Sequence, residues 1–250
     1  MVNFAAQGEG AASFGQDAHY YYTTNTVALV KLVEALRQRS YVRRFVQIGS
    51  SEVYGSVDHA AKETDPLNPS SPYGVSKAAF DMHLGIMHRI HGFPANIVRP
   101  SNAYCPGQQL HRIIPKAILC ALKGEYLQLH GGGLSEKSFI HGDDLSRGIV
   151  QVIEKGTPGA IYNCGPQNPT PIREIASMVA VLCGKEFQDL VAPAPERVGQ
   201  DGRYWLDSSA LKALGWMESV QLGRGIDEMI SWVRKYPELL KMDTTFRIRP

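Results

Sequence analysis

Short apolar segments alternate with longer segments of helical periodicity along the first hundred residues. We predict strands at 2–6, 44–48 and 94–98, separated by helices over 19–39 and 73–91. β-Branched residues in the short segments suit burial in a sheet. Strands and helices in this alternating order form parallel sheets with covering helices. The order therefore predicts an α/β chain built on a parallel sheet.

The alternation of strands and helices becomes less regular after Pro100, where prolines recur between shorter predicted strands and helices. The predicted elements are strands at 127–129, 139–140 and 160–162, and helices over 113–122, 143–154, 171–182 and 223–235. No linker-like segment separates the two halves of the chain. We therefore expect residues 101–250 to form a smaller α/β lobe that is interwoven with the sheet of residues 1–100.

Composition and charge narrow the classes of function. The 250 residues include 26 Lys and Arg and 24 Asp and Glu, for a formal net charge of +2. We expect no nucleic-acid partner, because no run of like charge would track phosphates. No apolar run approaches the roughly 20 residues of a membrane span, so no membrane partner is expected. The four cysteines form no CxxC pair, which predicts reduced thiols, no metal site and a cytoplasmic location.

Tyr73 and Lys77 are the strongest chemical signal. They lie four residues apart on a predicted helix, so their side chains share a face. A neighbouring ammonium group favours the phenolate and would lower the tyrosine pKa. A phenolate can act as a general base toward a sugar or alcohol hydroxyl. Taken alone, the spacing also fits an exposed tyrosine and lysine on a solvated helix.

Ser50, Ser51 and Glu52 give this pair a context. They follow directly on the strand at 44–48, and open α/β sheets bind ligands at the carboxyl ends of their strands. The competing interpretation is that the serines only terminate the strand while Glu52 faces water. A third strand, which runs into residues 99–102, would bring more polar groups to the same edge and favours a site.

These features resemble the extended short-chain dehydrogenase/reductases, and within them the NAD-dependent nucleotide-sugar epimerase/dehydratase family. The resemblance covers nearly all of the chain, in conserved order and spacing. The segments that carry it are Phe4-Ala-Ala-Gln7, Ser50-Ser-Glu-Val-Tyr-Gly55, Asn68-Pro-Ser-Ser-Pro-Tyr-Gly-Val-Ser-Lys77, Arg99-Pro-Ser-Asn-Ala-Tyr104 and Arg197-Val-Gly-Gln-Asp201. Around 113–115 and 202–207 the chain looks most like the dTDP-glucose 4,6-dehydratases.

The resemblance implies a fold, a cofactor and partners. It implies a Rossmann-like parallel sheet without its N-terminal strands, where residues 1–100 bind NAD and residues 101–250 mainly bind a nucleotide-diphosphate sugar. The implied cofactor contacts are Ala5, Ala6, Gln7, Tyr73, Lys77, Pro100 and Ser101, and the implied substrate contacts are Asn102, Lys137 and Arg197. The resemblance also implies a homodimer through the helices at 19–39 and 73–91. Apolar residues such as Leu84 and Ile86 on the second of these helices fit a core position equally well.

The reaction that the resemblance implies is a 4,6-dehydration. Tyr73 would deprotonate the sugar 4-hydroxyl while hydride leaves C4 for NAD, with Lys77 and Ser50 supporting the phenolate. Glu52 would remove the C5 proton, and water would leave from C6. Hydride would then return to C6, which gives a 4-keto-6-deoxy sugar. Arg197 would bind the diphosphate. The competing interpretation is that Arg197 is only a surface charge.

Several departures from the family pattern keep alternatives open. Ser51 replaces the aspartate with which dTDP-glucose dehydratases protonate the departing hydroxyl, and the motif resembles the Thr-Ser-Glu of GDP-mannose dehydratases and UDP-glucuronate decarboxylases. Gly8–Ala11 replaces residues expected to contact substrate. Lys137 replaces an arginine and loses its bidentate fork. The glycine-rich phosphate turn of the first strand is absent, and Gly8–Ser13 fits a loop beneath the nicotinamide better than a substitute turn.

Three functions therefore remain open. The leading hypothesis is an NAD-dependent nucleotide-sugar 4,6-dehydratase, and the second is an epimerase or a UDP-glucuronate decarboxylase on the same scaffold. Glu52 favours proton chemistry at C5 over a simple 4-epimerisation. The third hypothesis is an inactive nucleotide-sugar-binding protein. The missing first strands favour it, whereas the intact set of Ser50, Tyr73 and Lys77 favours an enzyme.

Overall fold

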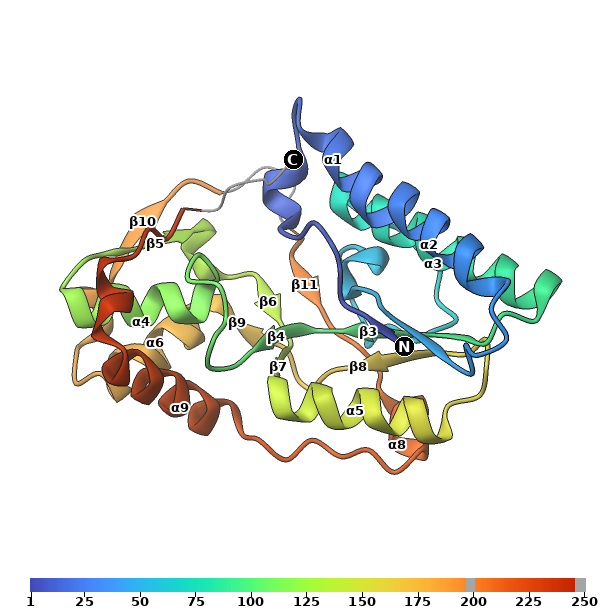
Figure 1. Ribbon diagram of the computed structural model, residues 1–250. Coiled ribbons are helices and arrows are strands. Elements are labelled where there is room, and N and C mark those ends of the chain that lie inside the picture. Colours follow the sequence, from blue (N-terminus) through green and yellow to red (C-terminus); the bar gives the residue numbers. More distant parts are fainter. Residues whose placement is uncertain (197–200, 246–250) are drawn as a thin grey trace.

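A parallel four-stranded sheet forms the centre of the first half of the chain (Figure 1). The structure is a computed structural model that describes residues 1–196 and 201–245. The strand order is β1 (Val2–Asn3), β2 (Phe45–Ile48), β3 (Ala95–Pro100) and β8 (Ile161–Cys164), and every neighbouring pair is parallel. The predicted α/β class with a parallel sheet is confirmed. The first strand is shorter than predicted, because the chain leaves the sheet after Asn3.

Helices cover both faces of this sheet (Figure 1). The helices on one face are α1 (Ala18–Tyr22), α2 (Leu29–Arg37) and α3 (Pro72–His91), and those on the other are α5 (Gly142–Lys155) and α8 (Ser209–Ala213). Successive strand residues point to opposite faces. Phe45 and Ile97 therefore pack in the core beneath α2 and α3, whereas Val46 and Val98 pack against α5. All four are buried.

The predicted helix over 19–39 contains a wide turn. A π-helix, Thr23–Ala28, joins α1 to α2 in place of a continuous α-helix. The wide turn contains Asn25, which is completely buried and hydrogen-bonds the segment that follows β1. Single π-helical turns are frequent at functional sites. An apolar periodicity near 3.6 residues cannot reveal such a turn, because the buried face continues through it.

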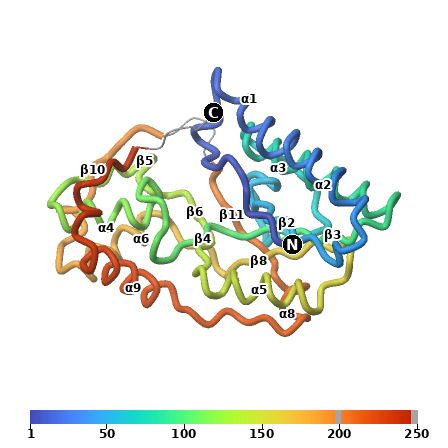
Figure 2. The backbone as a smooth tube through the Cα atoms, viewed as in Figure 1, coloured from blue at the N-terminus to red at the C-terminus, as the bar shows by residue number. Residues whose placement is uncertain are grey.

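A second lobe is built around α4 (Ile113–Lys123), α6 (Ile172–Leu182) and α9 (Leu222–Lys235), whose apolar faces share one core. Its strands are β5 (Leu127–His130) with β10 (Val191–Ala194), β6 (Glu136–Lys137) with β9 (Thr170–Pro171) and β11 (Arg203–Tyr204), and β4 (Asn102–Tyr104) with β7 (Phe139–His141). Shorter helical segments are Gly10–Ser13, Ser51–Tyr54, Gly131–Gly133, α7 (Phe187–Leu190) and Pro237–Lys241. The chain passes from sheet to second lobe and back more than once, since α5 and α8 return to the sheet (Figure 2).

The described residues show neither a membrane-crossing helix nor a group of side chains that could hold a metal ion. The four cysteines are free thiols, and two of them are buried. Cys164 lies in the core between β8 and α5, and burial raises the pKa of its thiol. The two buried cysteines, Cys120 and Cys164, therefore act as small core residues here.

Candidate active site

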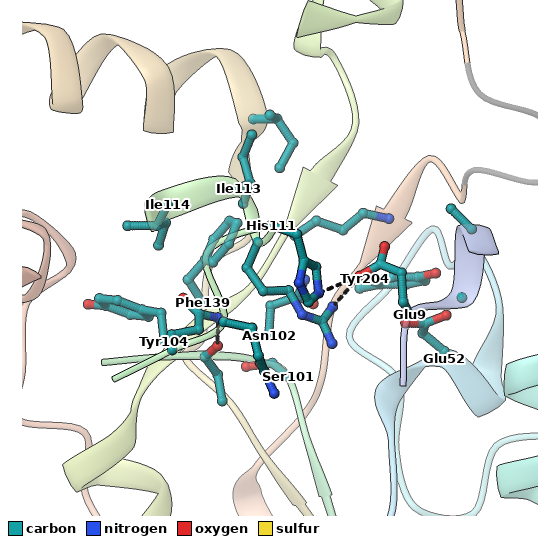
Figure 3. Close-up of a pocket in the computed structure, with 18 of the residues that line it drawn as sticks. Glu9, Glu52, Ser101, Asn102, Tyr104, His111, Ile113, Ile114, Phe139 and Tyr204 are labelled. Carbon is teal, nitrogen blue, oxygen red and sulfur yellow. Dashed lines mark hydrogen bonds and ion pairs between the residues drawn. The ribbon is translucent and has the colours of Figure 1, made fainter. Parts of the chain in front are cut away.

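A cavity of about 550 Å³ opens where the carboxyl ends of β2 and β3 meet the second lobe (Figure 3). This volume is within the range of small-molecule sites. The predicted site residues that line it are Ser50, Ser51, Glu52, Tyr73, Pro100, Ser101, Asn102 and Lys137. Ala5, Ala6, Gln7 and Lys77 are not on its wall, and Arg197 lies outside the described residues. The cavity therefore joins both strand-end motifs to the second lobe.

Tyr73 is placed by the start of α3. Ser71 is the N-cap residue, and its Oγ accepts a hydrogen bond of 3.1 Å from the Gly74 amide. Pro72 occupies the first turn, where its missing N–H is harmless. The Tyr73 amide donates to Ser13 Oγ at 3.0 Å. The first turn of α3 is thus attached to the segment after β1, which fixes the tyrosine at the cavity.

The turn after β2 places Ser50, Ser51 and Glu52. Ser50 Oγ accepts a 3.2 Å hydrogen bond from the Glu52 amide and so caps the short helix Ser51–Tyr54. Gly55 ends this helix with a φ of 69°, and a side chain there would overlap the carbonyl oxygen of Asn68. Only glycine suits both conditions. The tight turn keeps Glu52 on the cavity wall next to Ser50.

Burial governs the pKa values of the two main acid–base groups. Burial raises the pKa of Glu52 to about 7, although the Lys137 ammonium opposes the shift. The remaining exposed surface of Glu52 faces the cavity. Burial and the Glu52 carboxylate raise the pKa of Tyr73, whereas hydrogen bonding with Ser50 and the Arg112 charge act in the opposite direction. The sequence-based prediction that Lys77 lowers the pKa of Tyr73 is wrong for this structure, because burial dominates.

Lys77 is buried and directed toward the sheet. Its Nζ donates to the Ile48 carbonyl oxygen at 2.7 Å, and its side chain lies behind the cavity wall. Burial lowers its pKa to about 8, and the charge of Asp81, one helical turn further along α3, opposes this. The predicted common face of Tyr73 and Lys77 thus extends from the cavity into the core.

Below Lys77 lies a buried polar network. Arg99 Nε donates to Asp81 Oδ2 at 2.9 Å, and Arg99 Nη1 donates to the Tyr54 hydroxyl at 2.7 Å. Tyr54 in turn donates to Asn163 Oδ1 at 2.9 Å. Arg99 and Asp81 are each 2% exposed at the side chain. The network ties α3, β3 and β8 to the turn that carries Ser50 and Glu52.

Lys137 lies on the opposite wall, where β6 and β11 pair. Its Nζ donates to the Asp201 carbonyl oxygen at 2.8 Å and lies 3.3 Å from the centre of the Tyr204 ring. Burial lowers the pKa of Lys137 to about 8, while Asp201 and Glu52 favour its charged form. Tyr204 donates to Asp201 Oδ2 at 2.6 Å. Lys137 is therefore held by a carbonyl group and an aromatic ring.

Sequence reasoning missed five residues of the site: Glu9, Asn25, His111, Arg112 and Tyr204. Asn25 fixes the chain after β1, since it accepts from the Gln7 amide at 2.8 Å and donates to the Gln7 carbonyl oxygen at 2.9 Å. An asparagine inside a predicted amphipathic helix was a usable signal. Glu9 lies beside Arg112 although 103 positions separate them in the sequence, and no local pattern reports such a contact.

The nicotinamide half of NAD fits the residues present. Ala5, Ala6 and Gln7 follow β1, and Pro100 and Ser101 end β3 at the same edge of the sheet. The buried Ser101 Oγ has no hydrogen-bond partner among the described residues, which suits a polar ligand group. The described residues offer no glycine-rich turn for a dinucleotide diphosphate, since Glu9, Gly10 and Ala11 line the cavity instead.

Fold and site together define an α/β protein with a YxxxK helix and a Ser-Ser-Glu turn at the carboxyl edge of a parallel sheet. The site faces a cavity completed by a second lobe. The profile of the NAD dependent epimerase/dehydratase family matches residues 1–165. The chain belongs to this family.

Named relatives agree with this assignment. The chain is 33% identical to the dTDP-glucose 4,6-dehydratase of Streptomyces griseus, over 94% of this chain and 72% of that protein. It is 32% identical to a trifunctional UDP-glucose 4,6-dehydratase/UDP-4-keto-6-deoxy-D-glucose 3,5-epimerase/UDP-4-keto-L-rhamnose-reductase of Arabidopsis thaliana, over 95% of this chain. The chain spans only 36% of that plant protein.

Solved structures match the fold closely. The dTDP-glucose 4,6-dehydratase DesIV from Streptomyces venezuelae, with NAD and TYD bound, has a TM-score of 0.90 at 31% identity, and the match covers 95% of this chain and 73% of DesIV. The UDP-glucuronic acid 4-epimerase from Bacillus cereus, in complex with UDP-glucuronic acid and NAD, has a TM-score of 0.88 at 27% identity, over 93% of this chain and 74% of that one. The Rossmann-like fold is thus confirmed, and both dehydratases and epimerases share it.

Proposed function

We propose that this chain carries NAD-dependent nucleotide-sugar 4,6-dehydratase chemistry, which converts an NDP-hexose to an NDP-4-keto-6-deoxyhexose. The observation that carries the proposal is the meeting of Tyr73, Ser50 and Glu52 on one wall of the cavity. A simple 4-epimerisation has no use for a carboxyl group beside the tyrosine, whereas elimination across C5 and C6 requires a base. The dehydratases among the relatives support the same choice.

In this proposal each side chain has a defined task. Tyr73 takes the proton of the sugar 4-hydroxyl, with Ser50 hydrogen-bonded to the phenol oxygen. Glu52 removes the C5 proton, which the neighbouring C4 ketone makes acidic. Because its pKa is about 7, Glu52 can hold that proton and pass it to the departing C6 hydroxyl. The Ser51 hydroxyl is too weak an acid for this task. C5 takes up one proton when hydride returns to C6, and this balances the 4-hydroxyl proton that Tyr73 took and must release.

NAD, when bound, supplies reversible hydride transfer at C4 and C6. Its nicotinamide half would be held by Ala5, Ala6, Gln7, Tyr73, Pro100 and Ser101. The cofactor contact of Lys77 remains a prediction from the sequence, because its Nζ hydrogen-bonds the Ile48 carbonyl oxygen behind the cavity wall. Residues 1–100 would then supply the cofactor side of the site, and residues 101–250 mainly the sugar side. Asn102 and Lys137 line the cavity on the sugar side, and Arg197 remains a prediction for the diphosphate.

Product mass tests the proposed reaction. The protein is incubated with NAD and, separately, with dTDP-glucose, UDP-glucose, GDP-mannose and UDP-glucuronate. Loss of one water from a hexose supports the proposal, and loss of carbon dioxide from the uronate identifies a decarboxylase. An unchanged mass with inverted stereochemistry identifies an epimerase. If calorimetry detects binding of nucleotide sugar but none of NAD, the chain is a binding protein.

The dehydratase activity should fall as the pH decreases through about 7. Glu52 acts as a base only when deprotonated, and its pKa is about 7. We expect kcat/KM to decrease about tenfold per pH unit on the acid side. Glu52→Gln should remove the acid limb of the pH profile together with most of the activity. Glu63→Gln should retain both the acid limb and the activity. Glu63 is the matched control, because burial also raises the pKa of this carboxyl group, and it lies outside the cavity. An acid limb that stays at its position in Glu52→Gln would exclude Glu52 as the base.

A homodimer is also part of the proposal. Met82, Ile86 and Ile90 are 63%, 48% and 69% exposed, and they recur every fourth residue along α3. They form one apolar stripe on the outer face, whereas Leu84 and Met87 are buried in the core. An exposed apolar stripe of this kind fits a second copy of the same helix pair.

The predicted cytoplasmic location remains a prediction from the sequence.

The double variant Met82→Glu/Ile86→Glu should convert this dimer to a monomer. Two carboxylates in the centre of an apolar contact would have to be desolvated without partners. Light scattering after gel filtration measures the mass. The control is Val181→Glu, because Val181 is 71% exposed on α6 and far from the stripe. A wild-type protein that is already monomeric would contradict the proposed dimer.

A further inference from the structure

The segment Gly8–Gly10 follows β1, and its residues Glu9 and Gly10 line the cavity near Glu52 (Figure 3). Glu9, at its centre, has φ 77° and ψ 90°, and it is the one non-glycine residue with a positive φ in the described part of the chain. Such a conformation is unfavourable and persists only where its surroundings hold it. Strain of this kind is concentrated at functional sites.

Gly10 is closely enclosed by Glu52, whereas Gly8 only contacts Arg112. A side chain at Gly10 would overlap Glu52 Oε2. A Cβ atom at Gly8 would lie 3.4 Å from Arg112 Nη2. The backbone therefore passes between the proposed catalytic carboxylate and a cation of the second lobe.

The Glu9 side chain pairs with the Arg112 cation at this point and lies beside the His111 ring. Its Oε2 lies 3.1 Å from Arg112 Nη1 and 3.6 Å from His111 Nε2, and the side chain is only 20% exposed. The contact is close to the reacting atoms, since the Arg112 charge lowers and the Glu9 charge raises the pKa of both Tyr73 and Glu52. The pair thus lies at the sugar end of the cavity.

Lys137, the other cation whose charge lowers the pKa of Glu52, also has partners. Lys137 is held by the Asp201 carbonyl oxygen and the Tyr204 ring. Lys116 lines the cavity one helical turn beyond Arg112 on α4. Near Tyr73 and Glu52, the cavity wall carries the carboxylates of Glu9, Glu52 and Asp201. Arg112 and Lys137, the two cations whose charges act on Glu52, already have partners.

We propose that Glu9 is a specificity-determining residue, which makes the cavity select nucleotide sugars with a neutral hexose over those with a hexuronate. This inference rests on the proposed function. A hexuronate carries a carboxylate at C6, next to the carbon from which Glu52 would take a proton. That carboxylate would meet the carboxylates of Glu9 and Glu52, and it could pair with Arg112 only by displacing Glu9. Rejection through such a like-charge contact is a common device of specificity.

Calorimetric titration with UDP-glucose and UDP-glucuronate tests the inference, because the two ligands share their nucleotide and differ only in the sugar. We expect the wild-type protein to bind UDP-glucose at least about tenfold more tightly, the value of one charge-assisted contact. Glu9→Gln should reduce this ratio about tenfold by releasing Arg112. Glu9→Gln/Arg112→Gln should not bind the uronate as tightly as Glu9→Gln does. Glu125→Gln, a surface carboxylate beside Lys123, is the control and should keep the wild-type ratio.

Each other outcome identifies what is wrong. Equal wild-type affinity for both sugars overturns the role of Glu9. If Glu9→Gln raises the affinity for UDP-glucose, UDP-glucuronate and UDP alone by the same factor, this role is also overturned, because Arg112 would then bind the diphosphate. If a hexose is dehydrated but Glu9→Gln leaves the ratio unchanged, only this inference fails. If the wild-type protein binds no nucleotide sugar at all, the proposed function fails with it.

Discussion

Tyr73→Phe should lower the rate of 4-keto-6-deoxy sugar formation about a thousandfold while nucleotide-sugar affinity stays nearly constant. The substitution deletes only the phenol oxygen that takes the 4-hydroxyl proton. The backbone anchor to Ser13 Oγ remains, and so does the edge-on contact with the Tyr21 ring, whose centre lies 6.3 Å away. The loss should therefore fall on kcat rather than on binding.

Tyr162→Phe is the matched control for this experiment. Tyr162 is also a buried tyrosine, but it lies in β8 and its hydroxyl accepts a hydrogen bond from the Thr157 amide, far from the cavity wall. Its substitution should lower stability by about 1 kcal/mol and leave turnover intact. Equal activity losses in the two variants would mean that Tyr73→Phe acts through folding, and full activity of Tyr73→Phe would exclude Tyr73 as the base.

The second large effect concerns stability. Asp81→Ala should lower the free energy of unfolding by about 3–5 kcal/mol, because it leaves the buried Arg99 guanidinium without its carboxylate. Lys77, which is also buried, would lose the nearest negative charge. The remaining hydrogen bond from Arg99 to Tyr54 cannot compensate for an unpaired charge in the core. Urea unfolding followed by circular dichroism measures the change.

An exposed ion pair provides the comparison. Glu34→Ala removes the partner of Arg37 on the surface of α2 and should change stability very little. The double variant Asp81→Leu/Arg99→Met should recover much of the loss, since it removes both charges and retains volume. If Asp81→Ala unfolds at the same urea concentration as Glu34→Ala, the network does not stabilise the turn that carries Glu52.

Most of the secondary structure could be predicted from periodicity. The helix α3 begins one residue before its predicted start and ends where predicted, because Ser71 caps it and Gly92 stops it in a left-handed conformation with a φ of 63°. The π-helix could not be predicted in the same way. Its cause is the contact of Asn25 with Gln7 and Ser76, which lies in another element.

The candidate site was predictable where its residues follow strand ends. Parallel neighbouring strands end at one edge of the sheet, so the residues at their carboxyl ends lie close together. These residues are Ser50, Ser51 and Glu52 after β2, and Pro100, Ser101 and Asn102 at the end of β3. The direction of the Tyr73 pKa shift was not predictable. It depends on burial and on the Glu52 carboxylate, which comes from a different element of the fold.

The sequence by itself determined the alternation of strands and helices, the YxxxK helix and the Ser-Ser-Glu turn, because each of these depends on neighbours within a few residues. Only the tertiary structure decided that Lys77 points into the core and that Glu9 pairs with Arg112 across the cavity. The physical reason is that charge pairing and desolvation depend on distances through space. Those distances are set by how α3 packs onto the sheet for Lys77 and by how the second lobe meets the sheet for Glu9 and Arg112.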